Sequence, residues 1–326
     1  MDKSKLLFHR EYDSFYNMVE NNEIFSKYCE DVFGIDFSQD GYSDLEQIKD
    51  LLKAADIKSE YKVLDIGCGN GKMAEFIADQ TGAIVYGFDY SENAINNAIA
   101  RTQMKSNLIF EEGVFGEKQY SPESFDVILS IDTMYYTLDM ETFVKQIYGW
   151  LKPNGLFITF YEEGHLQGIS VDEYNTELAI VFKKNRISYE VMKYTKQLFE
   201  LMKHKREVLT RMKELFIENK MEFYYHCAMD TSVDVSMTYE DFQKGFNRFM
   251  YIVKKAEKVN KELSKIKDKE IKEYEVINED QDVKEDNEDN EDNEDKEHKE
   301  VKEDLEVKGD KEDKEDLEVI EYIENK

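Results

Sequence analysis

Three glycines at alternate positions, with an aspartate just ahead of them, are the residues of this chain best suited to hold a ligand. Gly67, Gly69 and Gly71 follow the apolar segment 62–66, which has the pattern of a buried parallel strand. Glycine lets the backbone approach a ligand closely, and a helix starting near Lys72 would point its first amides at the turn. Asp65 suits a ligand with a cationic or hydroxyl-rich end better than a pyrophosphate.

A second carboxylate follows the next strand of the sequence. Residues 83–88 form an apolar run that ends at Asp89, which stands 24 residues after Asp65. An acid about 20 residues beyond such a turn accepts hydrogen bonds from the hydroxyls of a ribose. Tyr90 comes next and is placed to lie against an adenine ring. The two acids and the glycines together predict a site for a nucleoside-containing cofactor.

The pattern D-x-G-x-G-x-G over 65–71, followed by Asp89, resembles the first two motifs of the class I S-adenosylmethionine (SAM)-dependent methyltransferases. The Phe-Asp-apolar strand at 125–130 and the L-K-P-N-G turn at 151–155 are further marks of that class. The resemblance covers about residues 60–230. It implies SAM as the cofactor and a cofactor site made of Asp65, Gly67, Gly69, Gly71, Asp89, Tyr90, Val114, Phe115 and Ile131. Many members have an acid where Val114 stands, so we expect a backbone contact to adenine there or at Phe115.

Apolar periodicity locates the elements that must position these residues. Helices are expected over 8–32 and 44–55 as an N-terminal cap that folds over the cofactor edge as a lid. Six strands are expected at 62–66, 83–88, 108–110, 125–130, 156–158 and 186–192, with helices near 72–78, 91–99 and 141–151 between the first five. Residues 165–185 form a further helix or a mobile segment. A long helix at 196–219, an antiparallel edge strand at 222–228 and a final helix through Phe242, Phe246, Phe249 and Ile252 complete the series.

This order of elements predicts an α/β fold, a Rossmann-like doubly wound sheet of seven strands. Ligands of such sheets bind at the carboxyl ends of the strands, so polar residues after strands four and five are candidates for the acceptor site. Asp132 would orient an amine and His165 would take a proton as catalytic residues. The substrate pocket would be lined by Tyr12, Tyr135, Tyr136, Tyr161 and Glu162. Tyrosine faces and carboxylates together suit a cationic or methylammonium group.

The net charge of −29 over 326 residues argues against partners that bind through phosphates or anionic lipids. We therefore expect no nucleic acid and no membrane as partners. The cysteines Cys29, Cys68 and Cys227 show neither a disulfide framework nor the spacing of metal ligands, so we expect no metal and a reducing compartment. The start of the chain shows no signal-peptide pattern, and no apolar run approaches the ~20 residues of a membrane span. We expect a cytoplasmic protein.

The acidic charge is concentrated at the end of the chain. Residues 279–326 contain 24 aspartates and glutamates and eight lysines. Such a segment cannot bury enough apolar surface to fold, so it is predicted to be a disordered acidic tail. The tail suits a basic protein or divalent cations as partners. Four parts follow: a helical cap at 1–58, a methyltransferase domain at 59–255, a charged helical extension at 256–278 and the tail at 279–326.

The function predicted from these residues is transfer of a methyl group from SAM to a nitrogen or oxygen of a small molecule. The transfer would be an in-line displacement, with the acceptor held at the ends of strands four and five. Alignment dominates such a step, and a general base is optional because an amine needs only to arrive deprotonated. Two alternatives stay open: a methyltransferase that acts on a basic protein steered by the tail, and a SAM-binding regulator without turnover.

Overall fold

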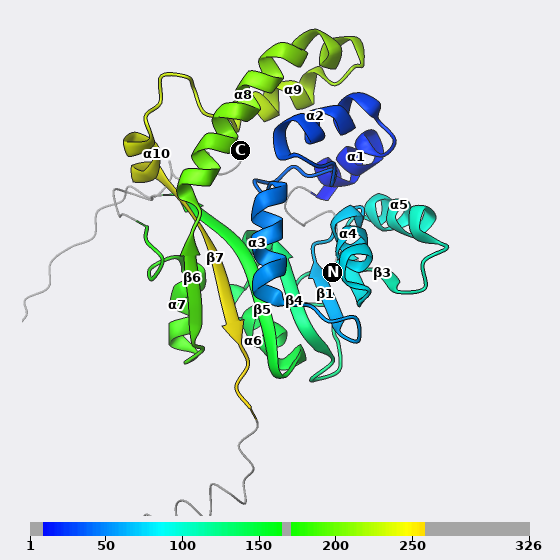
Figure 1. The fold of residues 1–326 in the computed structure, drawn as a ribbon, viewed down its shortest axis with the longest axis vertical. Coiled ribbons are helices and arrows are strands. Elements are labelled where there is room, and N and C mark those ends of the chain that lie inside the picture. The colour runs from blue at the N-terminus through cyan, green and yellow to red at the C-terminus, as the bar shows by residue number, and fades with distance from the viewer. Residues whose placement is uncertain (1–8, 165–170, 258–326) are drawn as a thin grey trace, which may run out of the picture. The chain divides into compact units, whose positions relative to one another are not determined.

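The computed structural model describes residues 9–164 and 171–257. One seven-stranded sheet carries the fold, and its strands follow the order β3-β2-β1-β4-β5-β7-β6 (Figure 1). The strands are β1 (Lys62–Ile66), β2 (Ile84–Asp89), β3 (Leu108–Glu112), β4 (Phe125–Ile131), β5 (Leu151–Gly164), β6 (Tyr189–Lys193) and β7 (Phe246–Lys254). The strands β1 to β5 are mutually parallel, and β7 lies antiparallel between β5 and β6. The predicted Rossmann-like, doubly wound sheet is confirmed.

The strand order reverses between β1 and β4. From β1 the chain winds through β2 to β3 in one direction, and from β4 to β5 in the other. Asp65 near the end of β1 stands opposite Gly87 of β2 on one side and Leu129 of β4 on the other. Connections leave this point in opposite directions and open a crevice, the usual ligand position in open α/β sheets. The glycine turn and the residues after β4 both lie there.

Helices cover both faces of the sheet, and each face has its own hydrophobic core. The helices α3 (Leu45–Ala55), α4 (Lys72–Thr81) and α5 (Glu92–Thr102) pack on one face, and α6 (Met140–Trp150) and α7 (Glu177–Lys184) on the other. Successive residues of β4 alternate between the two cores: Val127 and Leu129 join the first, whereas Ile128 joins the second. This double covering explains why the central strands are apolar at nearly every position.

The predicted helical stretch 8–32 is two helices, α1 (His9–Val19) and α2 (Glu23–Phe33). Asn21 breaks the helix with a φ of 60°. The side-chain oxygen of Asn22 then accepts the amides of Ile24 and Phe25. An asparagine at this position satisfies amides that have no partner within the helix, so it starts a new one. The apolar spacing continues across the break, and for that reason periodicity alone indicates a single helix.

The cap is built from two distant parts of the chain. The helices α1 and α2 share a hydrophobic core with α8 (Thr195–Glu218) and α9 (Glu222–Asp230). Phe25 and Tyr28 of α2 are fully buried in this core with Val208 of α8, and Tyr224 of α9 stacks near Phe15 of α1. Figure 1 shows α8 reaching from the sheet to the side of α2. The helices α1 and α2 are therefore only half of the cap, and the helix predicted as its second part at 44–55, α3, packs on the sheet instead.

The edge strand predicted at 222–228 is wrong, because these residues form α9. Aromatic residues favour strands in general, but packing decides the outcome here. Tyr224, Tyr225 and Ala228 lie on one helix face and are buried in the cap core, whereas Phe223 is 81% exposed. An isolated strand at this position would have left one of these aromatic faces without a partner.

The final helix predicted through Ile252 is also wrong beyond its first turns. The helix α10 (Tyr239–Gly245) ends where β7 begins. Residues 247–251 of β7 are all buried, because the strand lies between β5 and β6 and is covered on both faces. A run that is apolar at nearly every position satisfies a helical period as well as a strand. Burial from both sides, which one sequence does not display, separates the two cases.

Several predicted segments lie outside the described residues. These are His165, within 165–170, and the chain beyond residue 257, which contains nearly all of the predicted extension and the whole acidic tail. The helix α7 accounts for the end of the predicted segment 165–185. Within 9–164 and 171–257, no helix has the length and apolar character that crossing a membrane requires.

Candidate active site

A pocket opens at the carboxyl ends of β1, β2 and β4 and extends beneath the cap. Its empty space is about 1250 Å³, including the solvent at its mouth. One pocket thus joins the glycine turn to the tyrosines that follow β4. Its wall comes from the glycine turn, the ends of β2 and β3, the segment 131–138, helix α1 and the loop 37–43.

Most of the residues predicted for the site line this pocket. They are Asp65, Gly67, Gly69, Asp89, Tyr90, Val114, Phe115, Ile131, Asp132, Tyr12, Tyr135 and Tyr136. Gly71 does not line it; this residue precedes α4 and faces the ring of Phe110. Tyr161 and Glu162 of β5 lie behind the wall, the first in the core under α6 and α7 and the second in an ion pair with Arg248.

The glycine turn has a shape that side chains would not permit. Gly67 and Gly69 have φ angles of 70° and 52°, in the left-handed region that other residues rarely adopt. A Cβ on Gly67 would lie 2.7 Å from Cγ2 of Thr133, and one on Gly69 would collide with the hydroxyl of Tyr16. The carbonyl of Phe88 accepts the amide of Gly67 at 2.9 Å and holds the turn against β2. The turn is thus a built cradle at the floor of the pocket.

Asp89 is fixed at the edge of this cradle. Its carboxylate accepts the amide of Gly69 at 3.0 Å and that of Ser91 at 2.9 Å. The residue is 4% exposed, yet it lines the pocket. A carboxylate has about four acceptor positions, and acids at this place in α/β sheets accept ribose hydroxyls. Asp89 therefore fits the role that the sequence predicts.

Asp65 is a buried carboxylate that the described residues leave incompletely satisfied. Its Oδ2 atom has no hydrogen-bond partner within the described part of the chain. Burial, together with the charge of Asp89, raises the pKa of Asp65 to about 7. A buried acceptor without a partner is costly unless a ligand satisfies it. The cationic amino-acid end of SAM would do so, and its ribose would reach Asp89, so the residues present fit this cofactor.

The other end of the pocket is formed by tyrosines and an acid. The hydroxyls of Tyr12 and Tyr136 lie 2.6 Å apart, and the rings of Tyr135 and Tyr136 are 4.8 Å apart. Burial raises the pKa of Tyr12 and of Tyr136, so both hydroxyls stay protonated at neutral pH. Tyr16 stands one helical turn after Tyr12 and closes over the glycine turn. The helix α1 thus spans both ends of the site.

Sequence reasoning missed the loop between α2 and α3. The segment Phe37–Gly41 contributes five lining residues, of which Asp40 carries a charge. The side chain of Asp40 is exposed to the solvent of the pocket although protein surrounds it, and its pKa is raised by burial against the opposing effect of Lys205. The only signal in the sequence is an aspartate-glycine pair between two helices, which usually indicates a simple turn.

A buried ionic cluster lies behind the acceptor end. The guanidinium of Arg248 is 0% exposed and lies 2.7 Å from Asp132 and 2.5 Å from Glu162. It also donates to Gln47 at 2.9 Å and to Ser43 at 2.6 Å. Burial and the charge of Asp132 raise the pKa of Glu162 to about 8, although Arg248 opposes them. The cluster holds Asp132 at the pocket wall. Through Ser43 and Gln47 it also joins the loop 37–43 and α3 to the sheet.

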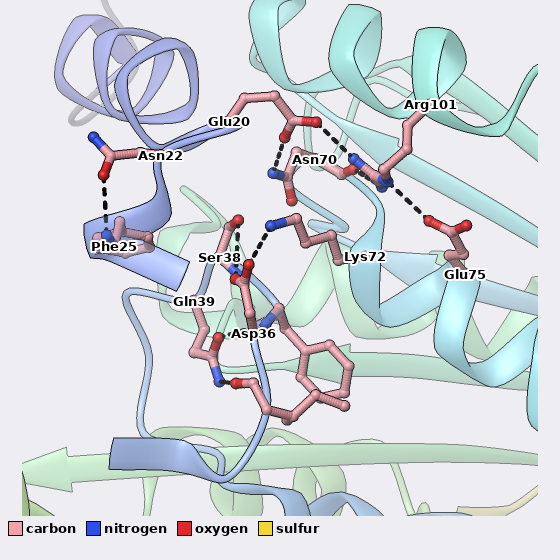
Figure 2. Close-up of polar contacts among 12 residues, drawn as sticks. Glu20, Asn22, Phe25, Asp36, Ser38, Gln39, Asn70, Lys72, Glu75 and Arg101 are labelled. Carbon is pink, nitrogen blue, oxygen red and sulfur yellow. Dashed lines mark hydrogen bonds and ion pairs between the residues drawn. The ribbon is translucent and has the colours of Figure 1, made fainter. Parts of the chain in front are cut away.

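A second set of polar contacts fastens the cap beside the glycine turn (Figure 2). Glu20, after α1, accepts from Asn70 at 2.6 Å and pairs with Arg101 of α5 at 3.1 Å. Lys72, at the start of α4, pairs with Asp36 at 2.6 Å, and both side chains are largely buried. Largely buried pairs of this kind are less screened by solvent than surface pairs. These two contacts hold the segment around Asp36 and the end of α1 over the part of the pocket that the glycine turn forms.

The fold and the site define a SAM-dependent methyltransferase. The chain matches the model of a methyltransferase-domain family over residues 57–315, and it belongs to that family. It is similar to the phosphoethanolamine N-methyltransferase of Plasmodium falciparum, with 30% identity over 226 residues that make up 62% of this chain and 84% of the relative. It is also similar to phosphoethanolamine N-methyltransferase 3 of Arabidopsis thaliana, with 37% identity over 134 residues, which are 40% of this chain but 27% of the plant protein.

Two solved structures show the same fold as this chain. Phosphoethanolamine N-methyltransferase 2 of Haemonchus contortus, in complex with phosphomonomethylethanolamine and S-adenosylhomocysteine, superposes with a TM-score of 0.60 at 22% identity, over 76% of this chain and 60% of that one. The cyclase SpnF superposes with a TM-score of 0.58 at 13% identity, over 76% and 96% of the two chains. The fold alone therefore does not decide the reaction. The family match, together with the cofactor cradle, identifies the reaction as methyl transfer. SAM is the cofactor of this enzyme.

Proposed function

We propose that this enzyme methylates a nitrogen of a small molecule, with SAM as the donor and an in-line displacement as the step. The observation that carries the proposal is the tyrosine and carboxylate wall that faces the cofactor cradle across one pocket. Relatives named as N-methyltransferases of small molecules support it. An oxygen acceptor needs a base; the residue predicted to take a proton, His165, lies outside the described residues, and Asp132, predicted to orient an amine, is held by Arg248.

The residues of the chain bring acceptor and cofactor into line. SAM, when bound, supplies a methyl group on a positively charged sulfur. The glycine turn, Asp65 and Asp89 fix the cofactor, while Tyr12 and Tyr136 close the acceptor end from the cap and from the segment after β4. Positioning of this kind is the main contribution that a protein makes to a displacement. The cap covers the cofactor end, and its contacts at Glu20 and Asp36 keep it in place.

The test is a turnover assay with SAM that carries a deuterated methyl group. Purified protein is incubated with small amines and matched alcohols, and mass spectrometry locates the label. We expect the label on nitrogen, and Tyr136→Phe should lower kcat more than it changes the affinity for SAM, because its hydroxyl contacts Tyr12 at the acceptor end. Label found only on oxygen would overturn the choice of nitrogen. SAM binding with no labelled small molecule would favour a protein substrate or a regulator.

A further inference from the structure

The charged side chains that line the pocket, among the described residues, are all acidic. Four aspartates line it: Asp40, Asp65, Asp89 and Asp132. Among the residues that the structure describes, no lysine, arginine or histidine does. A phosphate group is ordinarily bound by arginine or lysine side chains or by amides at a helix start. The acceptor end of this pocket offers carboxylates and tyrosine hydroxyls instead.

The two cations buried near this end are already committed to other groups. Arg248 has no exposed surface, and its donors serve Asp132, Glu162, Gln47 and Ser43. Lys205 is 3% exposed and donates to a threonine hydroxyl of the cap at 2.8 Å. Releasing either cation toward a ligand would break buried hydrogen bonds and leave polar groups without partners. Neither is available to neutralise an anionic acceptor.

Asp40 differs from the other three acids. Asp65 and Asp89 belong to the cofactor cradle, and Asp132 is neutralised by Arg248. Asp40 is exposed where it lines the pocket, forms no ion pair within 4 Å among the described residues, and receives a long hydrogen bond of 3.4 Å from Tyr224. The charge of the buried Lys205 and a contact with the Tyr12 hydroxyl only partly offset the effect of burial, which raises the pKa of Asp40. The charge of Asp40 acts on the hydroxyl groups of Tyr12 and Tyr136, which close the acceptor end. Among the described residues that line the pocket, its carboxylate is therefore the one best placed to receive a cation at the acceptor end.

We propose that the acceptor is a positively charged small amine without a phosphate group, and that Asp40 binds its ammonium beside Tyr12 and Tyr136. The proposal rests on the proposed N-methylation and names the acceptor's class. A carboxylate together with aromatic faces is a standard arrangement for an organic cation. This enzyme thus departs in acceptor charge from the relatives that are named for phosphoethanolamine.

The chemistry balances with the groups at hand. The ammonium gives one proton to Asp40 or to solvent, which leaves a neutral amine with a lone pair. The lone pair forms the new N–C bond as the C–S bond of SAM breaks, and the products are a methylated ammonium and S-adenosylhomocysteine. The positive charge of the donor passes to the nitrogen, so the acceptor end holds a cation before and after the step. An acidic wall suits both states.

The test compares acceptors that differ only by a phosphate. Ethanolamine is paired with phosphoethanolamine, and N-methylethanolamine with phosphomonomethylethanolamine, and simple alkylamines extend the phosphate-free set. Formation of S-adenosylhomocysteine gives kcat/KM for each compound, and SAM binding is titrated in the same preparation. We expect turnover of phosphate-free amines, with at least a tenfold lower kcat/KM for a phosphorylated partner. Preference for the phosphorylated member of either pair would overturn the proposal.

Substitutions at Asp40 separate recognition from folding. Asp40→Asn should raise KM for the amine by about ten- to a hundredfold at unchanged SAM affinity, the range expected for one charge-assisted hydrogen bond. Asp40→Lys should move the preference toward the phosphorylated partner, which a purely structural role would not do. Glu46→Gln, on the exposed side of α3, removes a carboxylate outside the pocket. It should change neither the KM for the amine nor the preference between the phosphorylated and the phosphate-free acceptor. If Asp40→Lys leaves the ratio of kcat/KM between the phosphorylated and the phosphate-free acceptor unchanged, the role of Asp40 is overturned.

Failure of the acceptor class is distinguishable from failure of the proposed function. If SAM binds and no phosphate-free amine is methylated, the acceptor class is rejected while the cofactor site stands. If methyl transfer reaches nitrogen only in phosphorylated amines, N-methylation stands and the charge argument fails. If the label reaches only oxygen, both proposals fail together.

Discussion

The guanidinium of Arg248 and the carboxylate of Asp132 lie 2.7 Å apart, with side-chain exposures of 0% and 6%. Arg248 belongs to β7, near the end of the described chain, whereas Asp132 follows β4 at the centre of the sheet. Glu162 of β5 joins them, so one buried cation faces two carboxylates. Burial raises the pKa of Glu162 to about 8, which lets this carboxyl keep its proton near neutral pH and lowers the net charge of the group.

Replacement of Arg248 by methionine should destabilise the fold strongly. It leaves Asp132, whose side chain is only 6% exposed, without its counter-ion, and breaking such a buried pair costs about 3–5 kcal/mol. Urea unfolding of the purified variant measures the loss. Arg211→Met is the matched control, because its side chain is 61% exposed and its pair with Asp31 should contribute about 0–1 kcal/mol. Equal stability of the two variants would contradict the buried cluster.

Replacement of Asp89 by alanine should weaken SAM binding by roughly ten- to a hundredfold. Hydrogen bonds to a charged acceptor contribute about 1.5–3 kcal/mol, which corresponds to that change in affinity. Isothermal titration calorimetry measures it. Asp79→Ala removes an exposed carboxylate of α4 that pairs with Lys105, so it should bind SAM like the native protein. Unchanged affinity in Asp89→Ala would mean that the ribose lies elsewhere.

SAM affinity should fall as the pH is lowered from 8 to 6. The pKa of Asp65 is raised to about 7 by burial and by Asp89, so this group becomes neutral below that pH and no longer attracts a cation. Affinity then falls by at most about tenfold per pH unit. Titrations at several pH values, repeated with Asp65→Asn, measure the effect. A native profile as flat as that of the variant would remove Asp65 from the site.

The same group makes a prediction for the stability of the cofactor-free protein. Because the folded pKa of Asp65 lies above its ordinary value of 3.8, its contribution to stability is complete below about pH 4 and is lost as the pH rises through about 7. The stability of the native protein should therefore fall relative to Asp65→Asn across that window. Thermal unfolding of both proteins between pH 4 and 8 measures the difference. A constant difference would contradict the raised pKa.

A methyl group added to the glycine turn should weaken cofactor binding strongly. Gly69→Ala places a side chain at a φ of 52° and against Tyr16, so the turn must shift. We expect SAM affinity to fall more than tenfold. Gly149→Ala is the matched control, since a Cβ there meets nothing within 4 Å and alanine favours a helix by about 0.5–1 kcal/mol. Normal binding by Gly69→Ala would contradict the tight turn.

The cofactor half of the site could be predicted from the sequence because its signals are local. The glycines, Asp65 and Asp89 lie within one strand-turn-helix-strand unit, and the geometry of that unit is dictated by short spacings. The sheet was predictable for the same reason as far as β6, since buried strands and amphipathic helices alternate along the chain.

The acceptor half could not be predicted in the same way, because distant segments build it. Tyr12 meets Tyr136 across 124 positions, and Arg248 meets Ser43 across 205. The two wrong predictions, a strand where α9 lies and a helix where β7 lies, have a related cause. Each is decided by what packs on its second face, and aromatic residues at consecutive positions fit either periodicity. Spacing along the chain carries no record of such contacts.

The central claim is that the pocket of Asp65, Asp89 and the glycine turn binds SAM, and calorimetric titration of the purified native protein with SAM and with S-adenosylhomocysteine tests it most directly. We expect micromolar binding of both, with one molecule bound per chain, because the two ligands share the ribose and amino-acid groups that these residues contact. Absence of heat from both titrations at concentrations up to the millimolar range would contradict the account.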